Sequence, residues 1–223
     1  MTFTSKLLRL LVCLFLCITI SDSIAQTNKK QLNVIAFYTG RNDQAHISFM
    51  HEAHKWFSEM GKKYNFTYDS TKDWSNMNAK FLAKYQAVVF LDTRVEDPIQ
   101  RKAFEEYMKN GGGWLGFHFA AFALTPSDFN ADWDWYHNEF LGSGQFVSNT
   151  WRPVPAYLRI EDHNHPATKG LPDIIKTSPS EWYRWEKDLR KNPDIKILLS
   201  VYSTSFPLGT GPKPNEIWHS GYY

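Results

Sequence analysis

Hydrophobic positions along the chain alternate between strand-length runs and helix-like spacing. Continuous apolar stretches occur at 32–38 (LNVIAFY) and 87–92 (AVVFLD), and shorter ones at 66–70 (FTYDS) and 114–118 (WLGFH). Near-continuous apolar strands that alternate with helices are typical of a parallel sheet covered on both faces. The pattern therefore predicts an α/β fold with three layers and a mostly parallel sheet.

Two long helices are predicted between these strands. In residues 42–63, Asn42 or Asp43 is the expected N-cap, and the apolar residues that follow at three-to-four spacing are Phe49, Ala53, Trp56 or Phe57, and Met60. A second helix is predicted from Pro98 to about Asn110, where the glycines 111–113 end it.

The first 25 residues have the composition of a secretory signal peptide. Lys6 and Arg9 precede an apolar run over 10–20, and the small residues 23–25 place the expected cleavage before Gln26. A membrane span needs about 20 apolar residues, roughly twice this run. We therefore expect a periplasmic or secreted protein with no stable membrane anchor after cleavage.

Composition excludes several classes of function for the expected mature chain, residues 26–223. Both cysteines, Cys13 and Cys17, lie in the signal segment, so disulfides, zinc–thiolate sites and a cysteine nucleophile are not expected. The formal charge of +2 is too small, and its basic residues too scattered, to predict nucleic-acid binding. The length suits one domain.

Polar side chains gather where the predicted strands end. Tyr38, Asp92 and His118 each lie at the carboxyl end of a strand, and His46 lies in the first turn of the helix that follows the first strand. In open parallel sheets, ligands bind at this edge. We therefore expect Tyr38, Asp92 and His118 to border the main cleft.

Four segments together resemble the ThuA-like family, named for trehalose utilisation, from about residue 32 to the end: GGGWLGFHFAAF, NDQAHISFMHEAHKWF, DHNHPATKGLP and SPSEWYRW. The resemblance implies a flavodoxin-like fold similar to class I glutamine amidotransferases. In those enzymes a catalytic cysteine stands at a strand-to-helix elbow, and here Gly116-Phe117-His118 occupies that stretch. Amidotransferase activity is therefore not implied, whereas a link to sugars is. Members usually continue with a strand pair and a closing helix, so we expect the domain to be truncated at Tyr223.

The candidate site residues follow from these positions and from the resemblance. His118 is the predicted general base or acid, because an imidazole exchanges protons near neutral pH. Asp92 is predicted to orient an imidazole, and Glu181 to act as a general acid or hydroxyl acceptor, although Asp92 capping a turn and Glu181 beginning a helix are open alternatives. Substrate binding is assigned to Tyr38, His46, His165 and Trp182, with His165 preferred to His163 because its HPATKGLP context matches the family.

Two further groups of residues have a structural and a functional interpretation. Segment 122–155, with a short helix expected at 132–140, is long for a connection and is predicted to act as a lid.

His51 and His54 are expected to face solvent on the outer part of their helix. Four tryptophans offer faces for sugar rings, although most are expected to pack the domain: Trp133, Trp135, Trp151 and Trp182.

The sequence thus predicts a domain that handles a carbohydrate or a carbohydrate-derived small molecule, as an enzyme with a histidine-centred site. A non-catalytic sugar-binding module is the first alternative. The second is a metal-dependent hydrolase in which His46, His118 and His165 hold zinc or another divalent metal, although their spacing does not require it. No cofactor is predicted.

Overall fold

The computed structural model describes residues 31–41, 44–121, 133–149, 153–202 and 205. Five sequence-based expectations lie wholly or partly outside these ranges: the signal peptide, the N-cap at Asn42 or Asp43, the lid over 122–155, the Trp151 sugar face and the truncated C-terminal end. Within the described ranges, no helix combines the length and the apolar character needed to cross a membrane.

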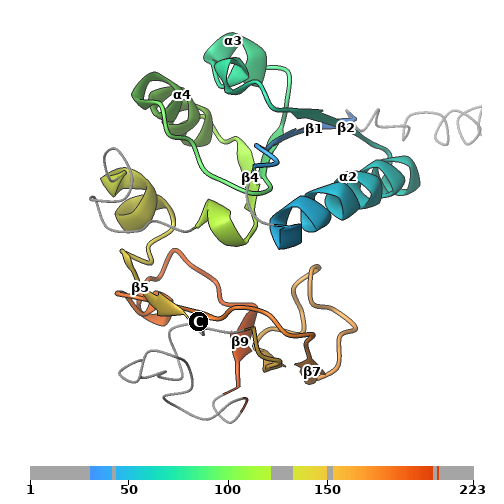
Figure 1. Cartoon of the computed structure of the whole chain (residues 1–223), viewed down its shortest axis with the longest axis vertical. Helices are drawn as coiled ribbons and strands as arrows, with labels where there is room; N and C mark the ends of the chain where they lie inside the picture. The colour runs from blue at the N-terminus through green and yellow to red at the C-terminus, as the bar shows by residue number, and fades with distance from the viewer. Residues whose placement is uncertain (1–30, 42–43, 122–132, 150–152, 203–204, 206–223) are drawn as a thin grey trace, which may run out of the picture.

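A four-stranded parallel sheet forms the centre of the first half of the chain (Figure 1). Its strands are β1 (Leu32–Phe37), β2 (Phe66–Thr71), β3 (Ala87–Phe90) and β4 (Gly113–Gly116), in the spatial order β2-β1-β3-β4. The order reverses direction between β1 and β3, and such a switch point is where doubly wound sheets bind ligands. All three pairings are parallel, as the continuous apolar runs predict.

Helices cover both faces of this sheet. Helix α2 (Gln44–Tyr64) lies on one face, and α3 (Ala79–Leu82) and α4 (Pro98–Lys109) lie on the other (Figure 1). Side chains alternate across a strand, so Val34 and Ala36 of β1 pack in the α2 cluster while Ile35 and Phe37 pack in the opposite cluster. The predicted three-layer α/β class is confirmed.

The start and end of α4 follow its sequence signals. The Asp97 carboxylate accepts hydrogen bonds from the backbone N–H groups of Ile99 and Gln100, and Pro98 occupies the first turn, where a missing N–H costs nothing. The chain leaves the helix through Gly111, whose φ of 84° is a left-handed value that glycine adopts without strain.

The described strands of the second half form two small antiparallel sheets, and none of them extends the parallel one. One pairs β5 (Phe146–Asn149) with β8 (Tyr183–Trp185), and the other has the order β7-β6-β9, formed by Ile174–Lys176, Tyr157–Ile160 and Leu199–Val201. The short helix expected at 132–140 is a six-residue π-helix, Trp135–Phe140. Three single 3₁₀ turns complete the described elements: Trp74–Asn76, His118–Ala120 and Leu189–Lys191.

Candidate functional site

His118 begins the 3₁₀ turn that follows β4. Its φ is 43°, and among the described non-glycine residues only Asn65 shares a positive φ. Left-handed backbone is strained for a residue with a Cβ, and such strain is concentrated at functional sites. Gly116, two residues earlier, has no room for a Cβ, which would lie 2.1 Å from the Trp114 ring. The local sequence therefore fixes an elbow that presents His118 at the sheet edge.

Hydrogen bonds join His118 directly to two side chains, His46 and Tyr183, and through Tyr183 to a third, Glu181. Its Nδ1 lies 3.0 Å from Nε2 of His46, in the first turn of α2. On the other side, its Nε2 lies 2.5 Å from the Tyr183 hydroxyl, which donates to Oε2 of Glu181 at 2.5 Å. The Glu181 oxygen is also 3.5 Å from Nε2 of His118. We call these four residues the histidine chain.

Hydrogen-bonding capacity gives the histidine chain one consistent proton arrangement. Because Tyr183 donates its single proton to the Glu181 carboxylate, its oxygen accepts from the Nε2–H of His118. A neutral His118 then has an unprotonated Nδ1, which accepts the Nε2–H of His46. Three hydrogen bonds therefore run in one direction and end on a carboxylate.

Tyr183 is the member of the histidine chain that sequence reasoning missed. It begins β8, and Glu181 lies two positions earlier. Residues two apart on an extended segment share a face, so the spacing in SEWYRW was the available signal. Trp182, the predicted substrate-binding residue between them, donates its Nε1–H to the Val154 carbonyl at 2.9 Å. That bond ties the Trp182 ring to the segment before β6.

Asp92 lies two residues after the end of β3 and is 1% exposed. Its Oδ1 accepts from the Thr39 backbone N–H at 2.7 Å, and its Oδ2 accepts from the Thr39 hydroxyl and the Gly40 N–H at 2.9 and 2.6 Å. These contacts hold the turn after β1 and correspond to the turn-capping alternative. The predicted role of Asp92 in orienting an imidazole stays a prediction.

Tyr38 and His54 form a separate group on the α2 side. The two rings lie 4.5 Å apart, and Nδ1 of His54 is 2.8 Å from the Tyr68 hydroxyl. Burial lowers the pKa of His54. The expectation that His54 is solvated is therefore wrong, because the helix turns it toward β2, whereas His51 is exposed as expected.

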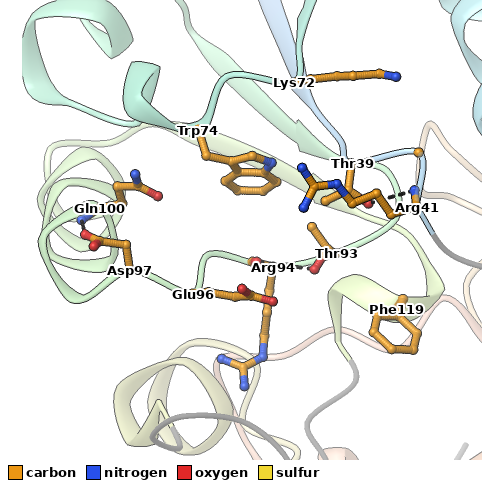
Figure 2. A pocket seen from close by; sticks show the side chains of 11 residues that line it. Thr39, Arg41, Lys72, Trp74, Thr93, Arg94, Glu96, Asp97, Gln100 and Phe119 are labelled. Atoms are coloured by element: carbon orange, nitrogen blue, oxygen red, sulfur yellow. Dashed lines mark hydrogen bonds between the residues drawn. The ribbon is translucent and has the colours of Figure 1, made fainter.

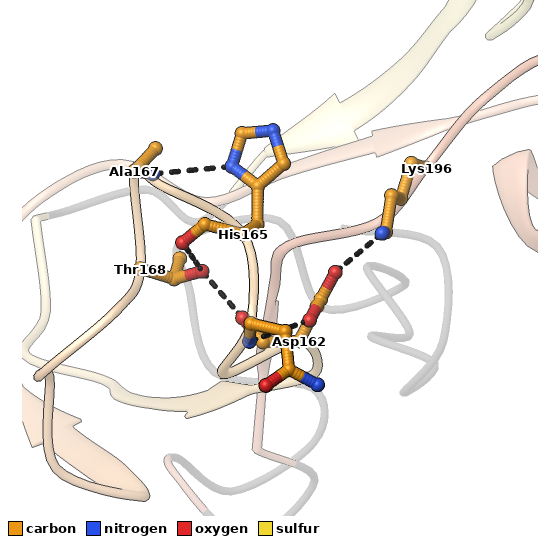
Figure 3. Close-up of polar contacts among 6 residues, drawn as sticks. Asp162, His165, Ala167, Thr168 and Lys196 are labelled. Atoms are coloured by element: carbon orange, nitrogen blue, oxygen red, sulfur yellow. Dashed lines mark hydrogen bonds and ion pairs between the residues drawn. The ribbon is translucent and has the colours of Figure 1, made fainter. Parts of the chain in front are cut away.

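His165 lies in the loop after β6 and is half-buried (Figure 3). Its Nδ1 accepts the Ala167 N–H at 3.2 Å, and its carbonyl accepts from the Thr168 and Lys169 N–H groups. In the same loop, the Asp162 carboxylate pairs with Lys196 at 2.5 Å. These contacts hold His165 within its loop and do not join it to His46 and His118. Within the described ranges, no three His, Cys, Asp or Glu side chains are grouped closely enough to hold a metal ion.

A cavity of about 720 Å³ opens at the switch point between β1 and β3 (Figure 2). Its walls come from the turns after β1 and β3, the Trp74 turn, the start of α4 and Phe119. Its volume lies within the range of small-molecule sites, about 300–1,000 Å³. The predicted residues Tyr38, Asp92 and His118 are not among the residues that line this cavity, whereas their neighbours Thr39, Thr93 and Phe119 are.

The tryptophans divide between the core and the cavity. Trp133 is 5% exposed and stacks on Tyr136, and Trp135 stacks on Phe140, so these two pack the domain as most were expected to. The tryptophan that lines the cavity is Trp74, which the sequence did not single out. It follows β2 at the same edge of the sheet, and this position was the signal for it.

Fold and site together define an α/β protein with a cavity at the carboxyl edge of a parallel sheet and a strained histidine at a strand-to-helix elbow. The chain belongs to the ThuA family, described as trehalose utilisation, whose model matches residues 34–220. The family predicted from the four motifs is therefore confirmed.

One of the similar solved structures supports this membership by sequence identity as well as by fold. A ThuA-like protein from Bacteroides uniformis is 34% identical, with 89% of this chain and 78% of that chain covered and a TM-score of 0.76. A ThuA-like protein from Parabacteroides merdae is 20% identical over 86% of this chain and 79% of that one, with a TM-score of 0.52, and supports the fold alone. A glutamine amidotransferase from Thermotoga maritima is a more distant neighbour, with 15% identity, coverage of 70% and 60%, and a TM-score of 0.37. No curated protein matches the chain significantly in sequence.

Proposed function

We propose that this chain is an enzyme that acts on a carbohydrate or a carbohydrate-derived small molecule, with His118 as its general acid–base group. The observation that carries the proposal is the histidine chain, in which both ring nitrogens of a strained, partly exposed histidine are hydrogen-bonded. Strained backbone and an ordered proton path at a ligand edge are the features expected of a catalytic group. The trehalose-utilisation family supports a sugar as the substrate class.

The histidine chain can move a proton without leaving charge on an imidazole. When Nδ1 of His118 takes a proton from substrate, the Nε2 proton passes to the Tyr183 oxygen and the Tyr183 proton passes to Glu181. The carboxylate is neutralised, and the substrate keeps the electron pair of the broken bond. His46, displaced from Nδ1 by the substrate, is then free to direct its Nε2–H at the substrate oxygen and stabilise the charge that develops there.

Access of substrate to His118 is open on one side. The side chain of His118 is 32% exposed and that of Glu181 is 25% exposed, so both reach solvent at the sheet edge. Tyr38, which follows β1, and Trp182, which lies between Glu181 and Tyr183 in the chain, are kept as proposed substrate-binding residues, and His165 would contribute only if its loop approaches a bound ligand. The N-terminal composition supports a periplasmic or secreted location without a stable membrane anchor, and the mild charge supports a small-molecule partner and not a nucleic acid.

A sugar-binding module without turnover is the second candidate function. The cavity at the switch point favours it, because a binding site at this place needs no proton transfer. The metal-dependent hydrolase has no such support, since His165 is held in its own loop. No cofactor is proposed.

The test is turnover by the full chain with trehalose, maltose and ketone-oxidised forms of both, followed by proton NMR of the products. We expect His118→Asn to lower kcat about 100-fold or more, because the asparagine amide exchanges no protons. Asparagine also tolerates the left-handed backbone, so folding is preserved. Tyr183→Phe, which interrupts the path to Glu181, is expected to lower kcat by about tenfold.

The matched control is His51→Asn, an exposed histidine on α2 outside the histidine chain, which is expected to leave kcat unchanged. Turnover by His118→Asn at the wild-type rate would refute the role of His118. Sugar binding without any turnover would establish the binding module instead.

A further inference from the structure

Trp74 presents a fixed aromatic surface to the cavity (Figure 2). Its ring lies 5.2 Å from that of Phe37 and 5.6 Å from that of Phe90, so part of the indole packs on the sheet. Its Nε1–H donates to the Tyr38 carbonyl at 3.2 Å, which fixes the orientation of the ring. The rest of the indole lines the cavity. A ring held in this way loses little entropy when a ligand packs against it.

Planar polar groups surround this aromatic surface. Arg41 lies on one side of Trp74 and Gln100 on the other, with Glu96 at the lower wall (Figure 2). A guanidinium, an amide and a carboxylate supply both donors and acceptors, and each can contact two neighbouring oxygens. Neighbouring hydroxyl groups around an apolar ring face are the defining chemistry of a glycosyl unit. The cavity therefore matches a sugar better than a purely apolar or a singly charged ligand.

Charges around the cavity argue against a phosphorylated or otherwise anionic ligand. The three cations Arg41, Lys72 and Arg94 are balanced by Glu96 and Asp97 in the wall and by Asp92 directly beneath the first turn. The start of α4 would be the natural place for a phosphate. Asp97 already occupies it, because its carboxylate accepts the N–H groups of Ile99 and Gln100.

Phe119 connects the cavity to the histidine chain. It follows His118 directly, lines the cavity, and its ring lies 5.6 Å from the ring of His46. A ligand unit in the cavity would therefore adjoin the position at which the histidine chain reaches the sheet edge.

We propose that the cavity at the switch point binds an uncharged glycosyl unit of the substrate, with Trp74 as its stacking surface and Arg41 and Glu96 as its hydroxyl-binding groups. This proposal rests on the proposed function, because it names the substrate class and the subsite of the same site. It adds that the protein prefers a neutral sugar to a phosphorylated one, a specificity that the histidine chain alone does not imply.

The experiment is calorimetric titration of the full chain with trehalose and with trehalose 6-phosphate, alongside intrinsic tryptophan fluorescence. We expect trehalose to bind more tightly than its phosphate by about tenfold or more, because the phosphate meets Glu96 and the Asp97 cap. Arg41→Ala and Glu96→Gln are each expected to weaken trehalose binding by roughly tenfold, the loss of a hydrogen bond to a charged group. Both residues are exposed, so neither change should affect folding.

Trp74→Phe tests the stacking surface and should weaken binding roughly threefold or more while abolishing the fluorescence change. Matched controls outside the cavity are Arg159→Ala, Glu59→Gln and Trp56→Phe, which are expected to bind as the wild type does. Circular dichroism checks that each variant is folded.

The outcomes separate this proposal from the proposed function. Trehalose binding that is unchanged in Arg41→Ala, Glu96→Gln and Trp74→Phe would overturn the cavity as the glycosyl subsite and leave the histidine chain untouched. Tighter binding of the phosphate would overturn the neutral specificity while supporting carbohydrate handling. Failure of the wild type to bind any sugar would overturn the proposed function, and this subsite with it.

Discussion

Asp92→Asn should destabilise the protein far more than Asp97→Asn, although both replace a carboxylate by its closest amide. Both oxygens of Asp92 act as acceptors, for two backbone N–H groups and one hydroxyl in the turn after β1. An asparagine keeps one acceptor oxygen but directs its NH₂ group at the Gly40 N–H, which lies 2.6 Å from Oδ2 in the wild type. The hydroxyl of Thr39 can rotate to accept, whereas the Gly40 N–H cannot.

The expected cost combines one buried unsatisfied N–H, about 1–3 kcal/mol, with the weakening of a charge-assisted bond. We therefore expect Asp92→Asn to lower the free energy of unfolding by about 2–4 kcal/mol and the Tm by roughly 5–15 °C. At Asp97 a single oxygen, Oδ1, accepts both N–H groups, and asparagine is an equally good N-cap. Asp97→Asn should cost less than about 1 kcal/mol.

Urea unfolding followed by circular dichroism measures both variants under the same conditions. Equal midpoints for Asp92→Asn and Asp97→Asn would refute the turn-holding role. If Asp92→Asn also kept wild-type stability and lost only turnover, the sequence-based prediction that Asp92 orients a catalytic imidazole would be supported.

Three further changes test the core. Gly116→Ala should lower the free energy of unfolding by about 1–3 kcal/mol, because the new Cβ meets the packed ring of Trp114; an unchanged urea midpoint would show that the ring moves aside. His137 is fully buried, and burial lowers its pKa to about 4. The free energy of unfolding should therefore decrease as the pH is lowered from about 6.5 to 4, by at most about 1.4 kcal/mol per pH unit. His137→Phe should make this decrease smaller in urea titrations at each pH, and an unchanged slope would contradict the assignment. Tyr68→Phe removes the hydrogen bond to His54 and should lower the free energy of unfolding by about 1 kcal/mol, measured by thermal unfolding. Unchanged stability would show that this hydrogen bond is not formed.

The sheet and its helices could be predicted from the sequence because local signals and packing agree there. Apolar runs such as AVVF are long enough to be buried on both faces, and Asp97 with Pro98 marks the start of α4 unambiguously. The second half of the chain has shorter apolar runs, which predict its strands less well. Strands of three or four residues, such as β7 and β8, carry too few positions for periodicity to separate parallel from antiparallel pairing.

The residues of the candidate site also differ in how far the sequence could predict them. His46 and His118 could be placed together because both follow from the order of parallel strands and helices. Tyr183 and Trp74 could not, since their roles depend on how a short strand and a single 3₁₀ turn pack against the main sheet. The substrate-binding role of His165 stays a prediction: it came from the family context, and in the structure its Nδ1 accepts the Ala167 N–H of its own loop.

The histidine chain crosses from one part of the fold to the other, and this explains how a strained residue keeps one orientation. His46 and His118 belong to the parallel-sheet half, whereas Tyr183 and Glu181 come from β8 and the segment before it. A left-handed backbone costs of order 1–3 kcal/mol and persists only where the surroundings over-determine it. Here hydrogen bonds on both ring nitrogens, one from each half, supply that constraint. The hydrogen bonds from His118 to Tyr183 and from Tyr183 to Glu181 therefore form only when β8 lies against the His118 turn, so any change that displaces β8 should affect His118 before it unfolds the parallel core.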